Sequence, residues 1–291
     1  MSAEARNHVR VYGRGSRPMV FAHGFGCDQQ MWRWVTPAFE DDYRLVLFDH
    51  VGAGQSDLSA YDPRKYGTLA GSATDLLEIC QALDLQDVIY VGHSVSAMIG
   101  VLAALREPQR FGQLVLVGPS PRYIDDGDHR GGFSQADIDQ LLDFLDSNHV
   151  GWSAAMAPVF MGQQPDPGLA QDLSNSFCRT DPAIARDFAR VTFLSDNRAD
   201  LPRVQTPSLI LQCREDVIAP LGVGDYVHAH LPGSQLVVLD AIGHCPHMSP
   251  PGRPKGEFRS AQHEGTPVSA PAATVAAIRA YLTQQAALPT P

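Results

Sequence analysis

DVIYVGHSVSAMIGVLAAL, residues 87–105, is the stretch that decides the fold of this chain. A short apolar run ends in GHSVS at 92–96, and a helical pattern then continues until Pro108, where helices commonly stop. Strand, tight turn and helix in this order form the context in which a G-x-S-x-G motif carries a nucleophilic serine. The fifth letter is Ser96 instead of glycine, so the pentapeptide alone leaves two interpretations open. Ser94 is either a nucleophile or a serine that merely starts a helix.

Similar apolar runs recur along the chain and predict a mostly parallel sheet. Each is closed by Gly, Pro or a polar residue, and near-continuous apolar runs of this length are typical of strands buried on both faces. Helical patterns separate several of them, as in 68–85, where Leu76, Leu77, Cys80 and Leu83 share one face. The fold class is therefore α/β, an open and mostly parallel sheet with helices between its strands. The runs lie at 18–24, 44–52, 87–94, 113–120, 207–213 and 235–243.

The alternation of strands and helices breaks twice. Residues 122–202 show helical spacing without a clear strand, with Ser134 as a plausible helix N-cap. We expect this segment to be a helical lid over the carboxyl edge of the sheet, where ligands bind in open α/β folds. It divides the core into residues 1–121 and 203–291. The segment 250–273 is rich in Pro and Gly and predicts a flexible loop before a last helix.

Two further residues of a serine hydrolase are predicted from their places at strand ends. His244 leaves the strand at 235–243 and is the preferred base, ahead of His247. Asp216 follows the strand at 207–213 and is the preferred acid that orients the base. The order Ser, acid, His is that of α/β hydrolases. The alternatives for the acid are Glu215, Asp49, Asp57 and Asp240.

The oxyanion of such a reaction needs backbone donors. HGFG at 23–26 follows the first strong strand and is similar to the loop that supplies one of them. The expected donors are the N–H groups of Phe25 and Val95. No phosphate loop, metal-ligand spacing or dinucleotide fingerprint is present, so we expect neither a cofactor nor a metal.

Composition excludes several other classes of protein. The 291 residues carry 22 basic and 32 acidic side chains, which gives a net charge of −10 and disfavours nucleic acid and anionic membranes. The five cysteines form no C-x-x-C pair, which argues against a disulfide framework or zinc site. The N-terminal residues lack an apolar signal region, and no apolar run is long enough to span a membrane. We therefore expect a cytoplasmic protein.

The motifs together resemble the RsbQ-like group of α/β hydrolases, which contains a bacterial stress-signalling hydrolase and the plant strigolactone and karrikin receptors. The resemblance extends to about residue 249, and GHSVS occurs in the plant receptors. About 20 residues near 251–271 depart from the group. The segments that carry it include HGFGCDQQMW (23–32), LFDHVGAGQSDLSAYD (47–62), YVGHSVSAMIG (90–100), LVLVGPSPRYIDD (114–126), PSLILQCREDVIAP (207–220) and GHCPHMS (243–249).

The resemblance implies a catalytic triad that matches Ser94, Asp216 and His244. It also implies a V-shaped lid of four helices and a small apolar cavity. The positions that match its pocket wall are Phe25, Trp152, Met156 and Phe193, although an aromatic residue of a lid is more often part of the lid's own core. Val95 matches a pocket position as well.

Two functions follow from this resemblance. The first is a serine esterase that acts on small apolar esters or lactones through an acyl-enzyme. The alternative is a ligand sensor, in which hydrolysis is slow and a protein partner at the lid receives the signal. The triad serves both, so the sequence does not separate them. A fold that only binds would require a missing triad residue, and none is missing.

Overall fold

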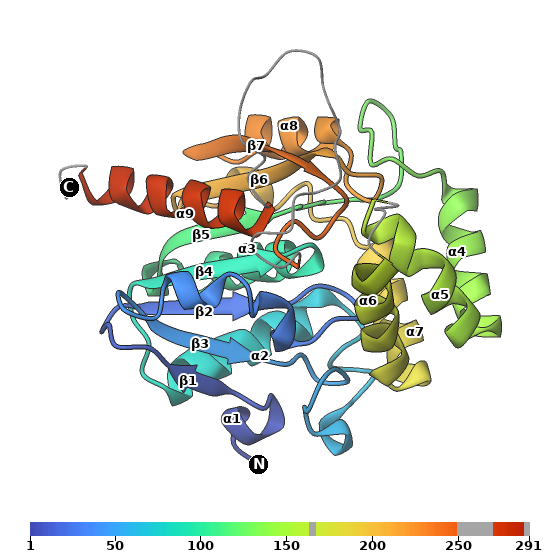
Figure 1. Cartoon of the computed structure of the whole chain (residues 1–291), viewed down its shortest axis with the longest axis horizontal. Coiled ribbons are helices and arrows are strands. Elements are labelled where there is room, and N and C mark those ends of the chain that lie inside the picture. Colours follow the sequence, from blue (N-terminus) through green and yellow to red (C-terminus); the bar gives the residue numbers. More distant parts are fainter. Residues whose placement is uncertain (163–166, 249–269, 288–291) are drawn as a thin grey trace.

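The computed structural model describes residues 1–162, 167–248 and 270–287, which form a seven-stranded sheet flanked by helices (Figure 1). The strand order is β1-β3-β2-β4-β5-β6-β7. Strands β2 to β7 run parallel, and β1 pairs antiparallel with β3 at one edge. The strands are β1 (Arg10–Tyr12), β2 (Pro18–Ala22), β3 (Arg44–Phe48), β4 (Val88–His93), β5 (Phe111–Val117), β6 (Ser208–Glu215) and β7 (Ser234–Ile242).

The six strands predicted from apolar runs are all present. In β2 and β4 every residue is buried, as expected for strands covered on both faces. Strand β7 differs, because it lies at the open edge of the sheet and most of its residues are partly exposed. Its apolar sequence therefore reflects its β-propensity more than two-sided burial.

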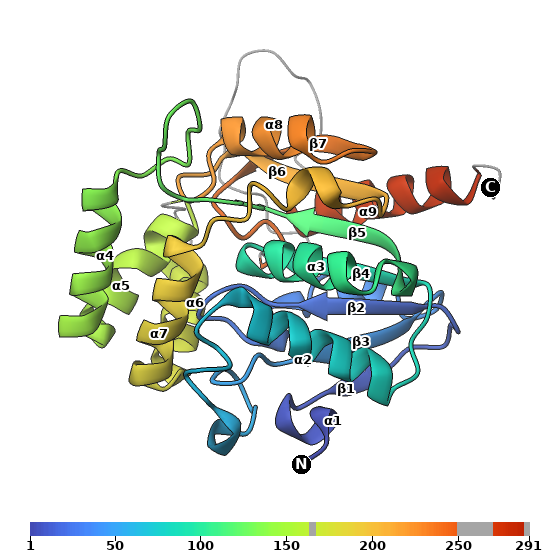
Figure 2. The same cartoon turned by 180° about the vertical axis from the view of Figure 1, so that it is seen from behind.

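Helices cover both faces of the sheet. Helices α2 (Leu69–Ala82), α3 (Val95–Arg106) and α8 (Leu221–His230) connect parallel strands and lie on one face, as right-handed crossovers require (Figure 2). Helix α9 (Ala270–Ala286) packs on the opposite face (Figure 1). The predicted apolar face of α2 is buried at Leu76, Leu77 and Cys80, and Leu83, the C-cap residue, is partly buried against the hydrophobic core.

Among the residues that the structure describes, four α-helices lie between β5 and β6, all within the segment 122–202. They are α4 (Gln135–Ser147), α5 (His149–Phe160), α6 (Pro167–Arg179) and α7 (Pro182–Leu194). They gather beside the carboxyl ends of the parallel strands, toward which the arrowheads point (Figure 1). Ser134 caps α4 as predicted, in a capping box with Asp137.

The insertion helices are bound to the core by polar contacts on two sides. The Tyr61 hydroxyl donates to Asp187 of α7 at 2.8 Å. On the other side, ion pairs join Arg33 to Asp172 at 3.1 Å and Arg179 to Asp28 at 2.9 Å, all three distances being between side-chain atoms. Two of the insertion helices, α6 and α7, are thus bound to the core by polar contacts.

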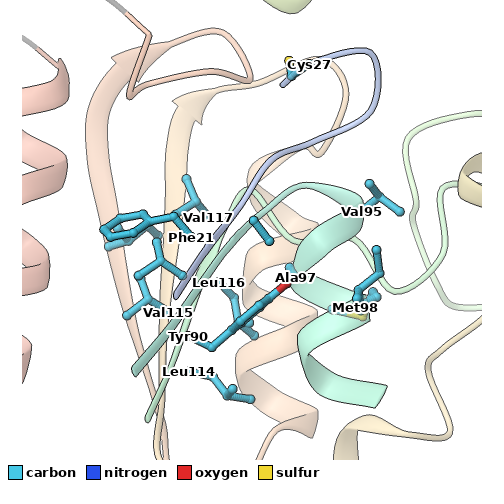
Figure 3. Packing of buried hydrophobic residues seen from close by; sticks show 14 of the residues in the cluster. Phe21, Cys27, Tyr90, Val95, Ala97, Met98, Leu114, Val115, Leu116 and Val117 are labelled. Atoms are coloured by element: carbon cyan, nitrogen blue, oxygen red, sulfur yellow. The ribbon is translucent and has the colours of Figure 1, made fainter. Parts of the chain in front are cut away.

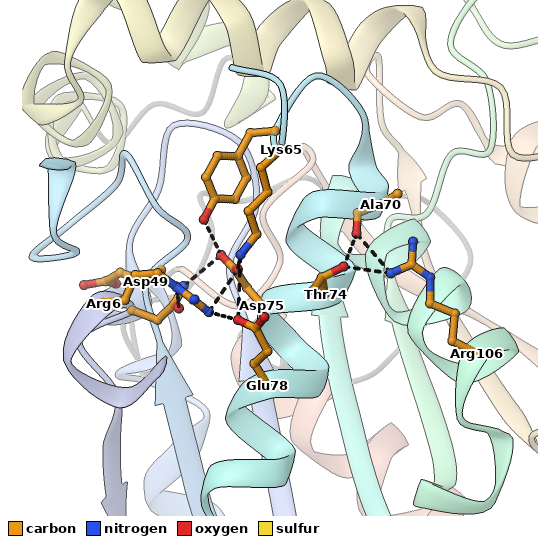
Figure 4. Close-up of polar contacts among 10 residues, drawn as sticks. Arg6, Asp49, Lys65, Ala70, Thr74, Asp75, Glu78 and Arg106 are labelled. Atoms are coloured by element: carbon orange, nitrogen blue, oxygen red, sulfur yellow. Dashed lines mark hydrogen bonds and ion pairs between the residues drawn. The ribbon is translucent and has the colours of Figure 1, made fainter. Parts of the chain in front are cut away.

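The N-terminal segment is anchored by a buried carboxylate in α2. Asp75 is 1% exposed, and its Oδ1 lies 3.0 Å from Arg6 Nη2 and 2.6 Å from Lys65 Nζ (Figure 4). The Tyr66 hydroxyl donates to Oδ2 at 2.9 Å. Two cations and a hydroxyl satisfy this carboxylate, as a buried charge requires. The cluster fixes α1 (Ala3–Arg6) against α2.

The sequence pattern does not reveal α1, β1 or α8, and it misplaces the start of the last helix. Residues 270–273 were assigned to the predicted loop, but they form the first turn of α9. Pro271 suits a first helical turn and Ala is the best helix former, so this composition is compatible with a helix start. The rest of the predicted loop insertion at 250–273 lies outside the described residues, as does the departure at 251–271 up to residue 269.

In the described ranges, none of the helices combines the length and apolar character needed to cross a membrane.

Candidate active site

Ser94 occupies a strained turn between β4 and α3. Its φ of 56° is unusual for a residue with a side chain, and backbone strain of this kind concentrates at functional sites. Its side chain makes no capping hydrogen bond to α3. The structure therefore gives no support to the interpretation of Ser94 as a simple helix-starting serine.

The turn is tight because glycines let β4 and α3 approach closely. A Cβ at Gly92 would lie 2.6 Å from both the Ser96 carbonyl oxygen and the Tyr90 ring, and one at Gly100 would lie 2.2 Å from that ring. The Tyr90 hydroxyl donates to the Ser96 carbonyl at 2.7 Å. Figure 3 shows Tyr90 lying between the strands and the first residues of α3. The small residues flanking Ser94 thus fix its position at the end of the sheet.

Ser94, His244 and Asp216 form one continuous hydrogen-bonded chain. Ser94 Oγ lies 2.8 Å from His244 Nε2, and His244 Nδ1 lies 2.7 Å from Asp216 Oδ2. They follow the carboxyl ends of β4, β7 and β6, three parallel strands of the sheet, and each is at most 6% exposed. This is the geometry in which a histidine takes a proton from a serine while a carboxylate holds the imidazole.

Asp216 is itself held in place, which separates it from the alternative acids. Its Oδ1 accepts the backbone N–H groups of Ile218 at 2.8 Å and Ala219 at 3.1 Å. Glu215 next to it is exposed. The other three alternatives have different partners: Asp240 pairs with Arg214, Asp57 caps a short helix at Ser59, and Asp49 accepts the backbone N–H groups of Gln29 and Gln55.

His244 is fixed by its backbone. Its N–H donates to the Phe160 carbonyl at 2.7 Å, and its carbonyl accepts from His93 Nε2 at 2.8 Å. His247 is placed differently, because its ring stacks on Trp32 with centroids 4.3 Å apart. Burial lowers the pKa of His247 to about 3, with His244 and Arg33 adding to the shift. His247 therefore remains neutral and apart from Ser94, and the structure brings His244 to the serine.

The loop HGFG, which we call the oxyanion loop (His23–Gly26), passes directly beside Ser94. A Cβ at Gly24 would lie 2.5 Å from His93 Nδ1 and 3.3 Å from Ser94 Cβ, so the close contact with the His93 ring requires glycine here. Val95 on the other side is the first residue of α3, and its N–H has no partner within the helix. Phe25 follows Gly24 in the loop and Val95 follows Ser94 in the chain, so the two predicted donors belong to the segments beside the nucleophile, and their role as oxyanion donors stays a prediction.

Aromatic rings fill the space between the oxyanion loop and the insertion helices. Phe25 is 7% exposed, and its ring centroid lies 5.9–6.0 Å from the rings of Trp152, Phe177, Phe188 and Phe193. Trp152 and Phe193 are each 1% exposed. Three of the four predicted pocket residues therefore meet in one cluster. The fourth, Met156, is partly buried and packs against the hydrophobic core.

Sequence reasoning missed Tyr123, whose hydroxyl lies 3.4 Å from Ser94 Oγ. The residue is fully buried, and burial raises the pKa of Tyr123 to about 12, against the opposing effect of its hydrogen bond to Ser94. It therefore stays protonated over the working range of a hydrolase. Its place six residues after the end of β5, at the carboxyl edge of the sheet, is the signal that could have revealed it.

Comparison with known proteins places this arrangement in a family. The family described as the alpha/beta hydrolase fold matches residues 17–251, which include the oxyanion loop and all three residues of the hydrogen-bonded chain. The chain belongs to the alpha/beta hydrolase family. The predicted fold class is thereby confirmed, and the chain is a hydrolase of this fold.

Its relatives include plant receptor hydrolases. A karrikin insensitive 2 receptor from Petunia hybrida is 40% identical over 249 residues, covering 85% of this chain and 92% of the relative. A strigolactone esterase from Arabidopsis thaliana is 39% identical over 251 residues, covering 86% and 93%. The predicted membership in the group that contains the plant receptors is confirmed.

A solved bacterial structure is similar as well. A hydrolase from Oleispira antarctica superimposes with a TM-score of 0.83 and 41% identity, covering 84% of this chain and 90% of the other. The likeness at this identity extends beyond the general fold.

Proposed function

We propose that this alpha/beta hydrolase cleaves small apolar esters or lactones through an acyl-enzyme on Ser94. The observation that carries the proposal is the unbroken chain of hydrogen bonds from Ser94 Oγ through His244 to Asp216. The strained backbone at Ser94 supports it, because the turn has no other evident use for a serine.

In the first half of the reaction, Ser94 Oγ attacks the carbonyl carbon and its proton passes to His244 Nε2. Asp216 stabilises the resulting imidazolium without taking the proton. The N–H groups of Phe25 and Val95 stabilise the oxyanion, and each such donor contributes on the order of 3 kcal/mol to transition states of this kind. The C–O bond to the leaving alcohol then breaks, and His244 gives its proton to that oxygen.

In the second half, water attacks the acyl-enzyme. His244 takes a proton from the water as it adds to the carbonyl carbon, and the same two N–H groups stabilise the second oxyanion. When the bond to Ser94 Oγ breaks, His244 returns the proton to the serine. The products are an acid and an alcohol, or one hydroxy acid from a lactone.

The aromatic cluster supports a compact apolar substrate. The ring of Phe25, in the oxyanion loop beside Ser94, meets those of Trp152 and Phe193, and burial of a charged group against these apolar rings would be unfavourable. The names of the relatives, a strigolactone esterase and a karrikin receptor, are consistent with such ligands. In this proposal α4–α7 act as the lid that encloses the substrate.

We do not put forward the ligand-sensor alternative, because no contact among the described residues separates it from an esterase. The two differ in rate and in the response of the insertion helices. Turnover near one per minute, together with altered hydrogen exchange in α4–α7 on ligand addition, would shift the proposal toward a sensor.

The test is hydrolysis of p-nitrophenyl acetate and butyrate by the full chain, with labelling by a fluorophosphonate probe as a second readout. We expect turnover and labelling of the wild type, and loss of both in Ser94→Ala. Ser208→Ala is the matched control, because Ser208 is also buried but bonds to the Thr206 carbonyl at the start of β6. Wild-type turnover in Ser94→Ala would refute the proposal.

A further inference from the structure

Ser96 stands where the G-x-S-x-G motif has glycine, and its side chain makes two buried hydrogen bonds. The residue is fully buried. Its Oγ donates to the carbonyl oxygen of His23 at 2.5 Å and lies 2.8 Å from His50 Nε2. One hydroxyl therefore joins α3, the oxyanion loop and the segment that follows β3.

The direction of these bonds follows from the number of protons available. A serine hydroxyl has one proton, and it goes to the His23 carbonyl, so Oγ must accept a proton from His50 Nε2. His50 is therefore the tautomer with Nε2 protonated. Burial and the neighbouring His23 lower its pKa well below the ordinary value, so the ring stays neutral and keeps this role.

His50 also holds His23 through its backbone. The His50 N–H donates to His23 Nε2 at 3.0 Å, which leaves the proton of His23 on Nδ1, 2.9 Å from the Gly24 carbonyl. The two imidazole rings are in edge contact, with centroids 4.6 Å apart, and the ring of Phe48 lies 5.2 Å from His50 on a further side. Ser96, His50 and His23 thus form a bridge in which each residue is hydrogen-bonded to the other two, and the His50 ring packs against the rings of His23 and Phe48.

This bridge ends at the residue that begins the oxyanion loop. His23 and Gly24 lead directly to Phe25, and a Cβ at Gly24 would lie 3.3 Å from Ser94 Cβ, so this part of the loop runs beside the nucleophile. A shift of His23 would therefore move the Phe25 N–H relative to the position of the oxyanion. Misplacement of a catalytic group by about 1 Å can cost roughly a hundredfold in rate.

We propose that Ser96 is a positioning residue for the oxyanion hole: its hydroxyl, with His50 as its partner, fixes the oxyanion loop so that the Phe25 N–H points at the developing oxyanion. The inference rests on the proposed function of Ser94 and names a further residue that the reaction needs. Removing the Ser96 hydroxyl leaves two buried groups without a hydrogen-bond partner, the His23 carbonyl and the Nε2–H of the His50 ring. The loop must then move to satisfy them.

The test compares two ways of breaking the bridge with one way of keeping it. Ser96→Ala and His50→Leu each remove a member. His50→Gln keeps an N–H near the position of Nε2 and is the conservative variant. Ser208→Ala is the control for loss of a buried serine hydroxyl at the far end of the sheet, where the oxyanion loop is not involved.

The readouts are kcat and KM for p-nitrophenyl acetate and the inhibition constant of phenylboronic acid, which forms a tetrahedral adduct on a nucleophilic serine. We expect Ser96→Ala and His50→Leu to lower kcat by about ten- to a hundredfold, with KM within about twofold. Boronate affinity should fall by the same factor as kcat/KM, because both depend on the oxyanion hole. The double variant Ser96→Ala/His50→Leu should have a kcat no lower than that of the less active single variant, since both substitutions break the same bridge.

His50→Gln should regain most of the activity that His50→Leu loses, and Ser208→Ala should behave as the wild type. Unchanged kcat and boronate affinity in folded Ser96→Ala would overturn the proposal. An equal loss in Ser208→Ala would also overturn it, because the effect would then be one of general stability. If Ser96→Ala does not fold, the comparison of His50→Gln with His50→Leu decides alone: equal activity of these two refutes the bridge.

Failure of this inference can be told apart from failure of the proposed function. A wild type that hydrolyses the ester, a Ser94→Ala variant that does not, and a Ser96→Ala variant that equals the wild type would reject only the bridge. Turnover that survives in Ser94→Ala would reject both.

Discussion

Replacing Asp216 by asparagine is the sharpest test of the hydrogen-bonded chain, because the structure fixes which way the new amide must face. Two backbone N–H groups, from Ile218 and Ala219, donate to Oδ1. In Asp216→Asn they will retain the amide oxygen, so the NH2 group takes the place of Oδ2, 2.7 Å from His244 Nδ1. An NH2 group donates only, so Nδ1 must become the acceptor.

The consequence is the wrong tautomer of His244. Its proton moves to Nε2, which lies 2.8 Å from Ser94 Oγ and can then no longer take the proton of the serine. We expect kcat for p-nitrophenyl acetate near neutral pH to fall by about 10⁴-fold, equivalent to about 5 kcal/mol of activation free energy. KM should change little, because the substrate does not touch Asp216.

Two measurements keep this prediction specific. Thermal unfolding of Asp216→Asn should show a cooperative transition, since the variant is nearly isosteric and keeps both backbone hydrogen bonds. Glu215→Gln is the control, because Glu215 is the neighbouring carboxylate but is exposed. A folded Asp216→Asn that keeps more than about a tenth of kcat would refute the reasoning, as would a Glu215→Gln variant that loses activity instead.

Two more predictions concern buried groups near the site. Tyr123→Phe should lower kcat by only about two- to tenfold in steady-state assays, because a single neutral hydrogen bond to Ser94 is removed; complete loss would make the phenol an essential proton donor. The free energy of unfolding should fall below about pH 6.5, because unfolded histidine binds a proton there while His247 in the fold binds one only near pH 3. His247 should lower the free energy of unfolding by about 2 kcal/mol between pH 7 and pH 5, as measured by urea titration. His247→Phe should remove this contribution, and a pH difference that is the same in the variant as in the wild type would contradict the prediction.

The parts of the site that the sequence predicts are those governed by strand ends. Ser94, Asp216 and His244 lie 150 positions apart at the extremes, yet each directly follows an apolar run. Parallel strands bring their carboxyl ends to one edge, so the order of the runs suffices to predict that the three side chains meet. The structure brings them together as predicted, with the distances given above.

The sequence could not predict contacts between segments that no apolar pattern links. Tyr123 reaches Ser94 from a loop with no regular spacing. Strand β1 has three residues, too few for an alternating pattern, and it exists because the edge of β3 is available. In residues 270–273, Ala and Pro are as common in loops as in a first helical turn, and burial of Ala270 and Pro271 favoured the helix.

The serine in the fifth position of the motif shows how a departure from a pattern can carry a role. Glycine is expected there because strand and helix pack closely at the elbow. In this chain that close approach is made at Gly92 and Gly100, where an added Cβ would meet the Tyr90 ring at 2.6 and 2.2 Å. Ser96 instead directs its hydroxyl to the loop beside the elbow. Because close packing is supplied by these two glycines, the fifth position is free to hold a hydrogen-bonding group, and that group reaches the loop on which the proposed chemistry depends.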